Sequence, residues 1–265
     1  SGGVKSSSRV SKPPKDFTLL KTESLVNFGK NESGQISSDG RRLLFVSSDR
    51  PQHKHRQAYE LNLDSKRERR ITFHDGDVTS IIYAADGRSY FYSSTTDEIK
   101  EDPDFIRKFR QQKSEKPEDT ELDFMGYEWP RTEIYFSNRE GSDIERITRN
   151  SGFDGFPTLS HDKKSLFFTS KRNGKFKVYS VRLPTSVASA LYPTSTSEYF
   201  LDQNGKWTVA SVAHSDLTKT SLEVSSGSKK STPITQLNHH SIHPTWHSAG
   251  EWILFSSNSE DSNNY

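Results

Sequence analysis

The sequence predicts an all-β fold, a β-propeller built from four-stranded blades. A turn-and-strand unit recurs five times along the 265 residues, and each of the first four copies is followed by a second pair of short strands. Aromatic residues make up 11% of a chain that is only 30% hydrophobic, with a mean hydropathy of −0.87. Aromatic side chains favour half-buried strands, and their number argues against disorder over most of the length.

The repeat contains an apolar residue, a short polar turn and an apolar strand that ends in Ser. Aligning the copies on their turns superimposes Gly40, Gly87, Lys163, Gly205 and Gly250. These positions are 47, 76, 42 and 45 residues apart, so the unit is 42 to 47 residues long and the second copy holds an insertion. The copies are ISSDGRRLLFVSS (36–48), YAADGRSYFYSS (83–94), LSHDKKSLFFTS (159–170), LDQNGKWTVAS (201–211) and WHSAGEWILFSS (246–257).

The chemistry of the turns explains this pattern. An Asp or Asn side chain bonds back to nearby backbone N–H groups and Gly adopts a positive φ, so Asp-Gly and Asn-Gly between strands predict hairpins. Four short strands in a unit of 42 to 47 residues match the strand number and length of a propeller blade. Blades must stack around an axis to bury their faces. The second strand pairs are expected at 57–63 and 69–73, 132–138 and 145–149, 176–183 and 189–193, and 220–226 and 232–237.

The ends of the repeat array leave the number of blades open. The fifth copy stops before any third strand, so the ring has five blades, or six with one beyond Tyr265. Residues 17–28, FTLLKTESLVNF, precede the first unit, and their SLVNF resembles the fourth strand RRITF. Because an unpaired sheet edge is a liability, this N-terminal strand is expected to complete the last blade.

Two regions are expected along the chain, a flexible basic leader at residues 1–16 and the propeller at 17–265. Residues 1–15 contain four basic and no acidic residues among Ser, Gly and Pro, which suits a linker or a membrane tether. No run of about 18 apolar residues is present to span a membrane. The chain has no Cys, which excludes disulfides and thiolate metal sites.

The insertion in the second unit, residues 97–131, is the main surface candidate for specificity. It carries 11 acidic and seven basic residues. A short amphipathic helix is expected from Asp102 as its cap and Pro103 at its first position. Insertions in repeat proteins fall on one face, where binding surfaces tend to lie. The segment is therefore either a partner-docking element or a solvated loop pinned by its aromatic residues, and the candidate partner-binding residues are Phe105, Phe109, Tyr127 and Trp129.

Motifs of common enzyme chemistry are missing from the sequence. There is no Gly-x-Ser-x-Gly for a hydrolase, no P-loop and no Gly-x-Gly-x-x-Gly to hold phosphates. Asp39, Asp86 and Asp162 occupy the turn position of the repeat, where a structural role explains them. The sequence therefore predicts no catalytic residue, no cofactor and no enzyme activity.

Four of the nine histidines lie within HHSIHPTWH, residues 239–247. The repeat places His243 and His247 along one inner strand, about 13 Å apart at about 3.3 Å per residue, too far to bind one zinc ion together. His240 and His243 are weak metal candidates if the preceding loop folds back over the channel mouth. Otherwise the histidines occupy variable positions that flank Pro244 and Trp246.

The units resemble the TolB-type propeller repeat, whose pattern runs roughly Pro-x-Trp-Ser-Pro-Asp-Gly, an apolar strand, Ile-Tyr and a Leu-Thr ending. HPTWHSAGEWILFSS, FPTLSHDKKSLFFTS, EIYFSN and RRIT carry the resemblance, over about residues 20–257. Lys163 replaces the turn Gly, Ala210 aligns with Phe168, and Ala249 replaces the turn Asp. The separate N-terminal α/β domain of TolB has no counterpart in this chain.

The resemblance implies a role in the bacterial envelope. The family includes the TolB protein of the Tol–Pal envelope system and the gating propellers of prolyl-oligopeptidase-like enzymes. We therefore expect a non-enzymatic scaffold, periplasmic or anchored at the outer membrane, that binds proteins such as a peptidoglycan-associated lipoprotein through one face and the axial channel. A net charge of +2 gives no general attraction to nucleic acid, and a monomer is expected. The alternatives are a metal-dependent carbohydrate-active propeller enzyme and the regulatory propeller of a peptidase.

Overall fold

The computed structural model of the protein confirms the all-β prediction. It describes residues 23–96, 130–150, 152–184, 188–191, 196–213, 219–227, 231–236, 239–247 and 250–258, and within these ranges every regular element is a strand. The predicted leader and residues 97–129 of the insertion, with the helix expected there, lie outside the described residues. A search of the described part for a helix long and apolar enough to span a membrane found none.

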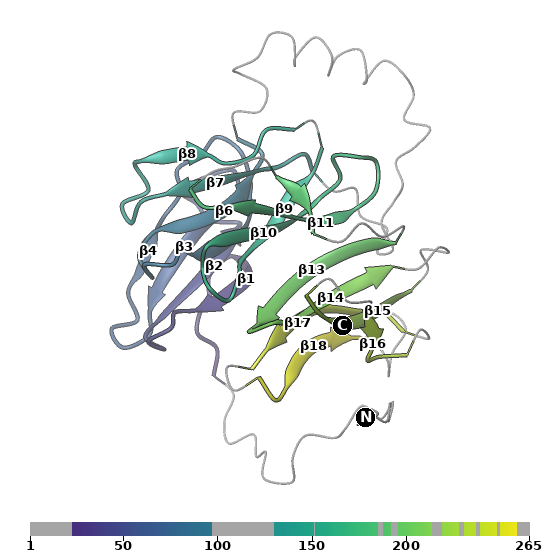
Figure 1. Ribbon diagram of the computed structural model, residues 1–265. Helices are drawn as coiled ribbons and strands as arrows, with labels where there is room; N and C mark the ends of the chain where they lie inside the picture. The colour runs from purple at the N-terminus through teal and green to yellow at the C-terminus, as the bar shows by residue number, and fades with distance from the viewer. Residues whose placement is uncertain are drawn as a thin grey trace.

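The strands form five antiparallel sheets, and each sheet follows chain order (Figure 1). Sheet 1 contains β1 (Lys30–Ile36), β2 (Arg42–Ser48), β3 (Gln57–Asn62) and β4 (Glu68–Arg70). Sheet 2 contains β5 (Val78–Tyr83), β6 (Tyr90–Ser94), β7 (Glu133–Ser137) and β8 (Ile144–Arg146). Sheet 3 contains β9 (Asp154–Leu159), β10 (Ser165–Ser170), β11 (Lys177–Arg182) and β12 (Ser189–Ala190). Sheet 4 contains β13 (Ser197–Asn204), β14 (Trp207–Ala213), β15 (Thr220–Ser226) and β16 (Thr232–Pro233), and sheet 5 contains β17 (Ser241–Trp246) and β18 (Ile253–Ser257).

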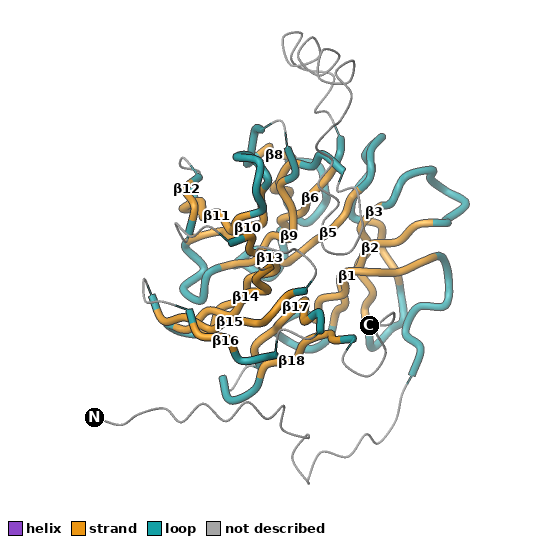
Figure 2. Tube along the Cα trace, turned by 90° about the vertical axis from the view of Figure 1, so that its right-hand side faces the viewer, coloured by secondary structure: helices purple, strands orange, loops and turns teal. Residues whose placement is uncertain are grey.

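The sheets are arranged as propeller blades around a common axis. The first strands β1, β5, β9, β13 and β17, hereafter the inner strands, contact one another in that order. The fourth strands β4, β8, β12 and β16 contact only the third strand of their own sheet among the described strands. Figure 2 shows the inner strands gathered near the middle of the molecule. Each contact between consecutive sheets is called a seam here, so seam 2/3 joins sheets 2 and 3.

The turns between the first two strands have the predicted chemistry. The Asp39 carboxylate accepts hydrogen bonds from the Ser37 hydroxyl at 2.6 Å and the Arg41 N–H at 3.1 Å. These bonds lower the pKa of Asp39, the Ser37 bond most strongly. Gly40 adopts a φ of 71°, and Lys163 at the same repeat position adopts a φ of 59°. The structure thus supports a local structural role for this turn.

We expect Lys163→Gly to raise the free energy of unfolding by about 0.5–1 kcal/mol. A side chain in the left-handed region costs about 1–2 kcal/mol, and the greater freedom of glycine in the unfolded chain offsets part of the gain. Gly40→Ala is the matched control, because a Cβ there would meet nothing within 4 Å and only the backbone conformation would oppose it. Urea denaturation should show stabilisation by the first change and destabilisation by the second; the same sign for both would contradict this explanation.

The fourth strands are shorter than predicted, and in sheets 1, 2 and 4 threonine side chains replace part of their backbone ladder. The Thr72 hydroxyl accepts the Ala58 N–H at 2.8 Å, just beyond β4. Thr148 and Thr235 do the same for Ile134 and Leu222, at 2.9 and 2.8 Å. Since the third strand donates to a hydroxyl instead of a carbonyl, strand pairing ends at two or three residues.

Aromatic and aliphatic side chains fill the seams. At seam 1/2, Val46 and Ile71 pack in one buried cluster with Tyr92 and Tyr135. At seam 2/3, Phe168 packs with Phe91, Ile134 and Tyr179. Ala210 occupies the position of Phe168 in sheet 4, as the alignment predicted, and it is buried in a smaller cluster with Phe167. The repeat therefore preserves which positions are buried while side-chain volume varies between seams.

The N-terminal strand predicted at residues 17–28 is not found in the part that is described. Residues 23–29 form no strand. Val26 instead packs against Phe45, Tyr59 and Leu61 of sheet 1. Phe45 and Tyr59 hold the positions by which Phe168 and Tyr179 of sheet 3 contact the preceding sheet. The chain therefore covers this face with an irregular segment, because a few apolar contacts suffice there without a strand ladder.

Candidate functional site

A β-bulge interrupts each inner strand, and it leaves one residue of each strand out of the regular pairing near the axis. The bulged residues are Ser33, Thr79, Phe156, Phe200 and His243, hereafter the axial row. All except Thr79 lie in the left-handed region, with φ between 51° and 56°. A bulge leaves its extra residue out of the ladder and redirects its side chain.

Contacts between sheets join members of the axial row in two groups, one across sheets 3 to 5 and one across sheets 1 and 2. The rings of Phe156 and Phe200 have centroids 4.6 Å apart, and those of Phe200 and His243 are 4.0 Å apart. The Ser33 hydroxyl donates to the backbone carbonyl of Thr79 at 3.3 Å. The axial row is thus chemically uneven, with hydroxyls at sheets 1 and 2 and three packed rings at sheets 3 to 5.

His243 combines exposure with an apolar environment. Its side chain is exposed, yet its imidazole packs on Phe200 and lies 6.3 Å from the ring of Phe156. Burial of the ring by this surrounding protein lowers the pKa of His243 below its usual value. At neutral pH the imidazole is therefore uncharged, with one donor and one acceptor nitrogen.

The histidines of the predicted metal site are placed on and beside β17. His243 lies in β17 among aromatic rings, and His240 precedes this strand and donates its backbone N–H to Asn258 at 2.8 Å. The described residues contain no group of three His, Asp or Glu side chains arranged to hold a metal ion. The predicted partner-binding residues Phe105, Phe109, Tyr127 and Trp129 lie outside the described residues.

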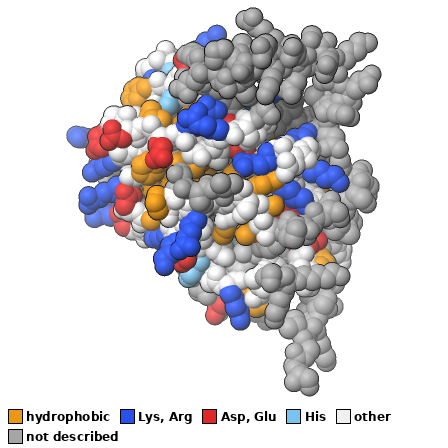
Figure 3. Space-filling view, turned by 45° about the horizontal axis from the view of Figure 1, so that its top comes forward, with side chains coloured by type: hydrophobic (Ala, Val, Ile, Leu, Met, Phe, Trp, Pro, Cys, Tyr) orange, Lys and Arg blue, Asp and Glu red, His pale blue; other side chains and the backbone are white. Residues whose placement is uncertain are grey.

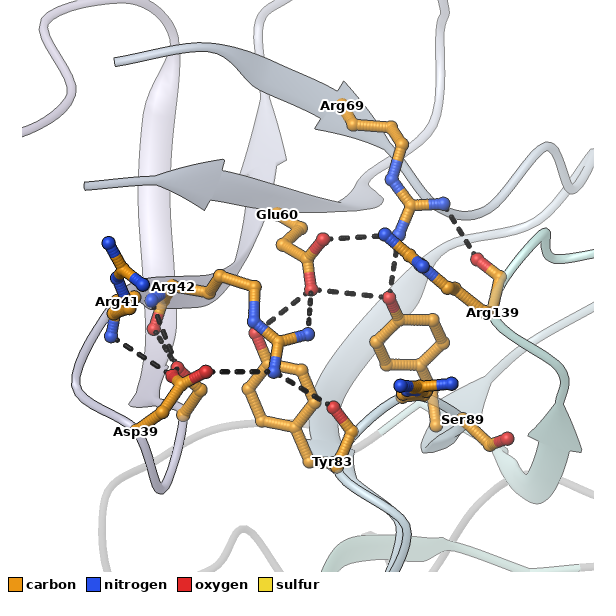
Figure 4. A network of polar contacts seen from close by, with 12 residues as sticks. Asp39, Arg41, Arg42, Glu60, Arg69, Tyr83, Ser89 and Arg139 are labelled. Atoms are coloured by element: carbon orange, nitrogen blue, oxygen red, sulfur yellow. Dashed lines mark hydrogen bonds and ion pairs between the residues drawn. The ribbon is translucent and has the colours of Figure 1, made fainter. Parts of the chain in front are cut away.

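A second polar constellation surrounds Glu60 at seam 1/2 (Figure 4). Its carboxylate accepts from Arg69 at 3.1 Å and from the Tyr83 hydroxyl at 3.0 Å, and it pairs with Arg42 at 3.4 Å. Desolvation, and then the charge of Glu60, raise the pKa of Tyr83 above its usual value and that of Tyr90 to about 12. A buried phenol with a raised pKa is a poor nucleophile. This network therefore fits a structural role between sheets 1 and 2.

The surface view provides no strong electrostatic signal. Figure 3 shows Lys and Arg side chains interleaved with Asp and Glu, with hydrophobic side chains between them. This mixture agrees with the small net charge of +2. The axial row is the more specific candidate because each of its residues lies at the bulge of an inner strand.

Comparison with solved structures identifies the fold. TolB from Acinetobacter baumannii matches with a TM-score of 0.62 and 17% identity, over 89% of this chain and 53% of that one. A putative TolB from Agrobacterium tumefaciens matches with a TM-score of 0.62 and 15% identity, over 88% of this chain and 77% of that one. A chain of hydrazine synthase from Kuenenia stuttgartiensis matches with a TM-score of 0.66 and 13% identity, over 88% of this chain and 36% of that one.

This protein has a TolB-like β-propeller fold. The identities are low and one match is an enzyme by name, so the likeness shows the fold alone. The chain spans about half the length of the A. baumannii TolB structure, with 53% of that chain covered. No protein-family model matches the sequence, and no curated protein matches it.

No sequence motif marks the axial row. Ser33, Phe156 and His243 each lie six residues before the turn residue of their unit, Asp39, Asp162 or Ala249. Their side chains differ so much that no motif is visible. The spacing from the turn identifies these three residues, but Thr79 and Phe200 lie seven and four residues before Asp86 and Asn204, so no sequence signal marks the whole row.

Proposed function

We propose that the protein is a non-enzymatic TolB-like scaffold that binds partner proteins in the bacterial periplasm through the axial row and the adjoining loops. The supporting observation is the row of rings on left-handed backbone. Non-glycine residues in this conformation cost about 1–3 kcal/mol each and cluster at functional sites. Sheet 2 has its bulge without a left-handed residue, so the propeller does not need this conformation to form a bulge.

The exposed His243 and the half-buried Phe156 suit an extended protein segment, and the buried ring of Phe200 packs against both of them. Aromatic side chains supply a large contact area, and a neutral His offers a donor and an acceptor without the cost of burying a charge. The resemblance of the repeats to those of TolB supports the periplasmic location. An envelope lipoprotein is the partner that this resemblance favours.

A photo-crosslinking residue at position 243 should capture a discrete partner from an envelope extract. The same residue at position 144 is the control, because Ile144 is 47% exposed on β8 at the outer side of the molecule. Phe156→Ser should lower the yield at position 243 severalfold, since Ser33 shows that serine fits this backbone conformation. Equal products from positions 243 and 144 would contradict binding at the axial row.

Two further measurements separate the scaffold from its alternatives. A pull-down with and without residues 97–131 tests the contribution of the insertion. Metal analysis of the purified protein tests the enzyme alternative. Stoichiometric Mn or Zn that is lost in the His240→Ala, His243→Ala double variant would overturn the proposal.

A further inference from the structure

Equivalent positions at three seams carry different charges. The N–H groups of Val78, Asp154 and Glu198 donate to the carbonyls of Arg56, Thr132 and Phe176, at 2.9, 2.9 and 3.1 Å. The residues that follow these carbonyls are Gln57, Glu133 and Lys177. Seam 1/2 therefore pairs Gln57 with Val78, seam 2/3 pairs Glu133 with Asp154, and seam 3/4 pairs Lys177 with Glu198.

The three pairs differ in charge balance. Lys177 and Glu198 have opposite charges and lie 3.7 Å apart. Gln57 is neutral, and its amide donates to the backbone carbonyls of His74 and Gly76. Glu133 and Asp154 are two acids, and the relative exposure of each is 0%. Seam 2/3 alone among these three holds like-charged groups.

Arginines partly compensate the two acids. Arg146 lies 3.2 Å from Glu133, and Arg172 lies 2.9 Å from Asp154. Glu133 also accepts from the Thr148 hydroxyl and from the Asn150 N–H, each at 2.5 Å. The other charged residues on the segments around the pair are Arg131, Glu145, Arg149, Lys171 and Lys177.

We propose that Glu133 and Asp154 form a proton-linked lock, which tightens seam 2/3 on acidification by taking up one proton between them. A proton removes the repulsion between two buried carboxylates and leaves a donor for a hydrogen bond. The pair lies where the chain returns from the insertion into sheet 2, because the Thr132 hydroxyl donates to the Asp154 carbonyl at 2.7 Å. The role is separate from partner binding at the axial row.

The direction of the pH dependence follows from the burial of the pair. Desolvation raises the pKa of Glu133 and of Asp154, and the charge of Asp154 raises that of Glu133 further. The native protein then binds more protons than the unfolded chain in the pH range between the ordinary and the raised values. The lock is thus strongest below this range and weakens as the pH rises through it.

Hydrogen exchange of two equivalent amides tests the lock locally. Asp154 N–H and Val78 N–H make the same cross-seam bond, at the charged and the neutral seam. After correction for intrinsic exchange, the protection of Asp154 relative to Val78 should rise severalfold from pH 8 to pH 5, because the native pair binds more protons than the unfolded chain. Glu133→Gln should abolish this rise, and Gln57 shows that glutamine fits the slot.

Asp64→Asn is the matched control, because Asp64 forms an exposed ion pair with Arg41 at 2.9 Å. This substitution should leave the pH-dependent rise in protection unchanged. Asp154→Asn provides a second test in which the same rise should vanish. Two results would overturn the lock. One is a protection ratio that does not change with pH in the wild-type protein, and the other is a rise in Glu133→Gln and Asp154→Asn as large as in the wild-type protein. These readouts do not depend on partner binding.

Discussion

Arg172→Met is expected to lower the free energy of unfolding by about 3–5 kcal/mol at neutral pH, because it leaves a buried carboxylate without its cation. The Arg172 guanidinium lies 2.9 Å from Asp154, whose side chain is fully buried. Methionine keeps a flexible apolar stem against Phe168 and Tyr179, whose ring centroids lie 5.3 and 4.5 Å from the guanidinium carbon. The loss therefore reports mainly on the removed charge, and urea denaturation measures it.

Arg50→Met is the matched control for this change. Arg50 stacks on Phe45 and Tyr59 in the same way, but its partner Glu68 is 28% exposed and can be hydrated when the cation is removed. The loss at Arg50 should therefore be clearly smaller. The double variant Arg172→Met, Asp154→Asn should recover part of the stability. Equal losses for Arg172→Met and Arg50→Met would contradict the assignment of a buried charge at seam 2/3.

Phe168→Ala is the second change with a large expected effect, a loss of about 3–5 kcal/mol in the free energy of unfolding. Phe168 is 1% exposed and packs in the cluster of seam 2/3. Truncating its ring removes apolar contacts and leaves a cavity between two sheets. Thermal and urea denaturation should agree on the loss.

Ile144→Ala provides a control for the generic effect of truncation, because Ile144 is 47% exposed. Its cost should stay within about 0.5 kcal/mol. Sheet 4 tolerates Ala210 at the position of Phe168 because its seam is filled by other residues, including Phe167 and Leu201. A small loss in Phe168→Ala would mean that seam 2/3 can close around the missing ring.

The repeat and its turns were readable in the sequence because their signals are local. An Asp followed directly by a Gly, between two apolar runs, predicts a hairpin independently of the rest of the chain. Lys163 was recognised as occupying a glycine position, and its φ of 59° confirms that alignment. The fourth strands were predicted too long, since the pattern of RRIT does not reveal that the threonine hydroxyl enters the ladder.

The candidate sites were less accessible from sequence because they depend on contacts between distant segments. Phe156 and His243 lie six residues before the turn residue of their units and Phe200 lies four before Asn204, so neither residue type nor spacing links the three, and their proximity is visible only in the structure. The Glu133 and Asp154 pair is likewise formed by two sheets. His243 was placed on the inner strand by the alignment, while its packing against Phe200 could not be derived from spacing.

The threonine hydroxyls that end the fourth strands have a consequence for the outer rim of the molecule. Sheets 1 to 4 each present an outermost strand of only two or three residues. Such short edges offer few free backbone groups in register to a neighbouring molecule, and long flat edges are the ones that recruit other chains. A single side chain in the repeat, at Thr72, Thr148 and Thr235, thereby shortens the outer edge of sheets 1, 2 and 4 and disfavours strand pairing with another molecule.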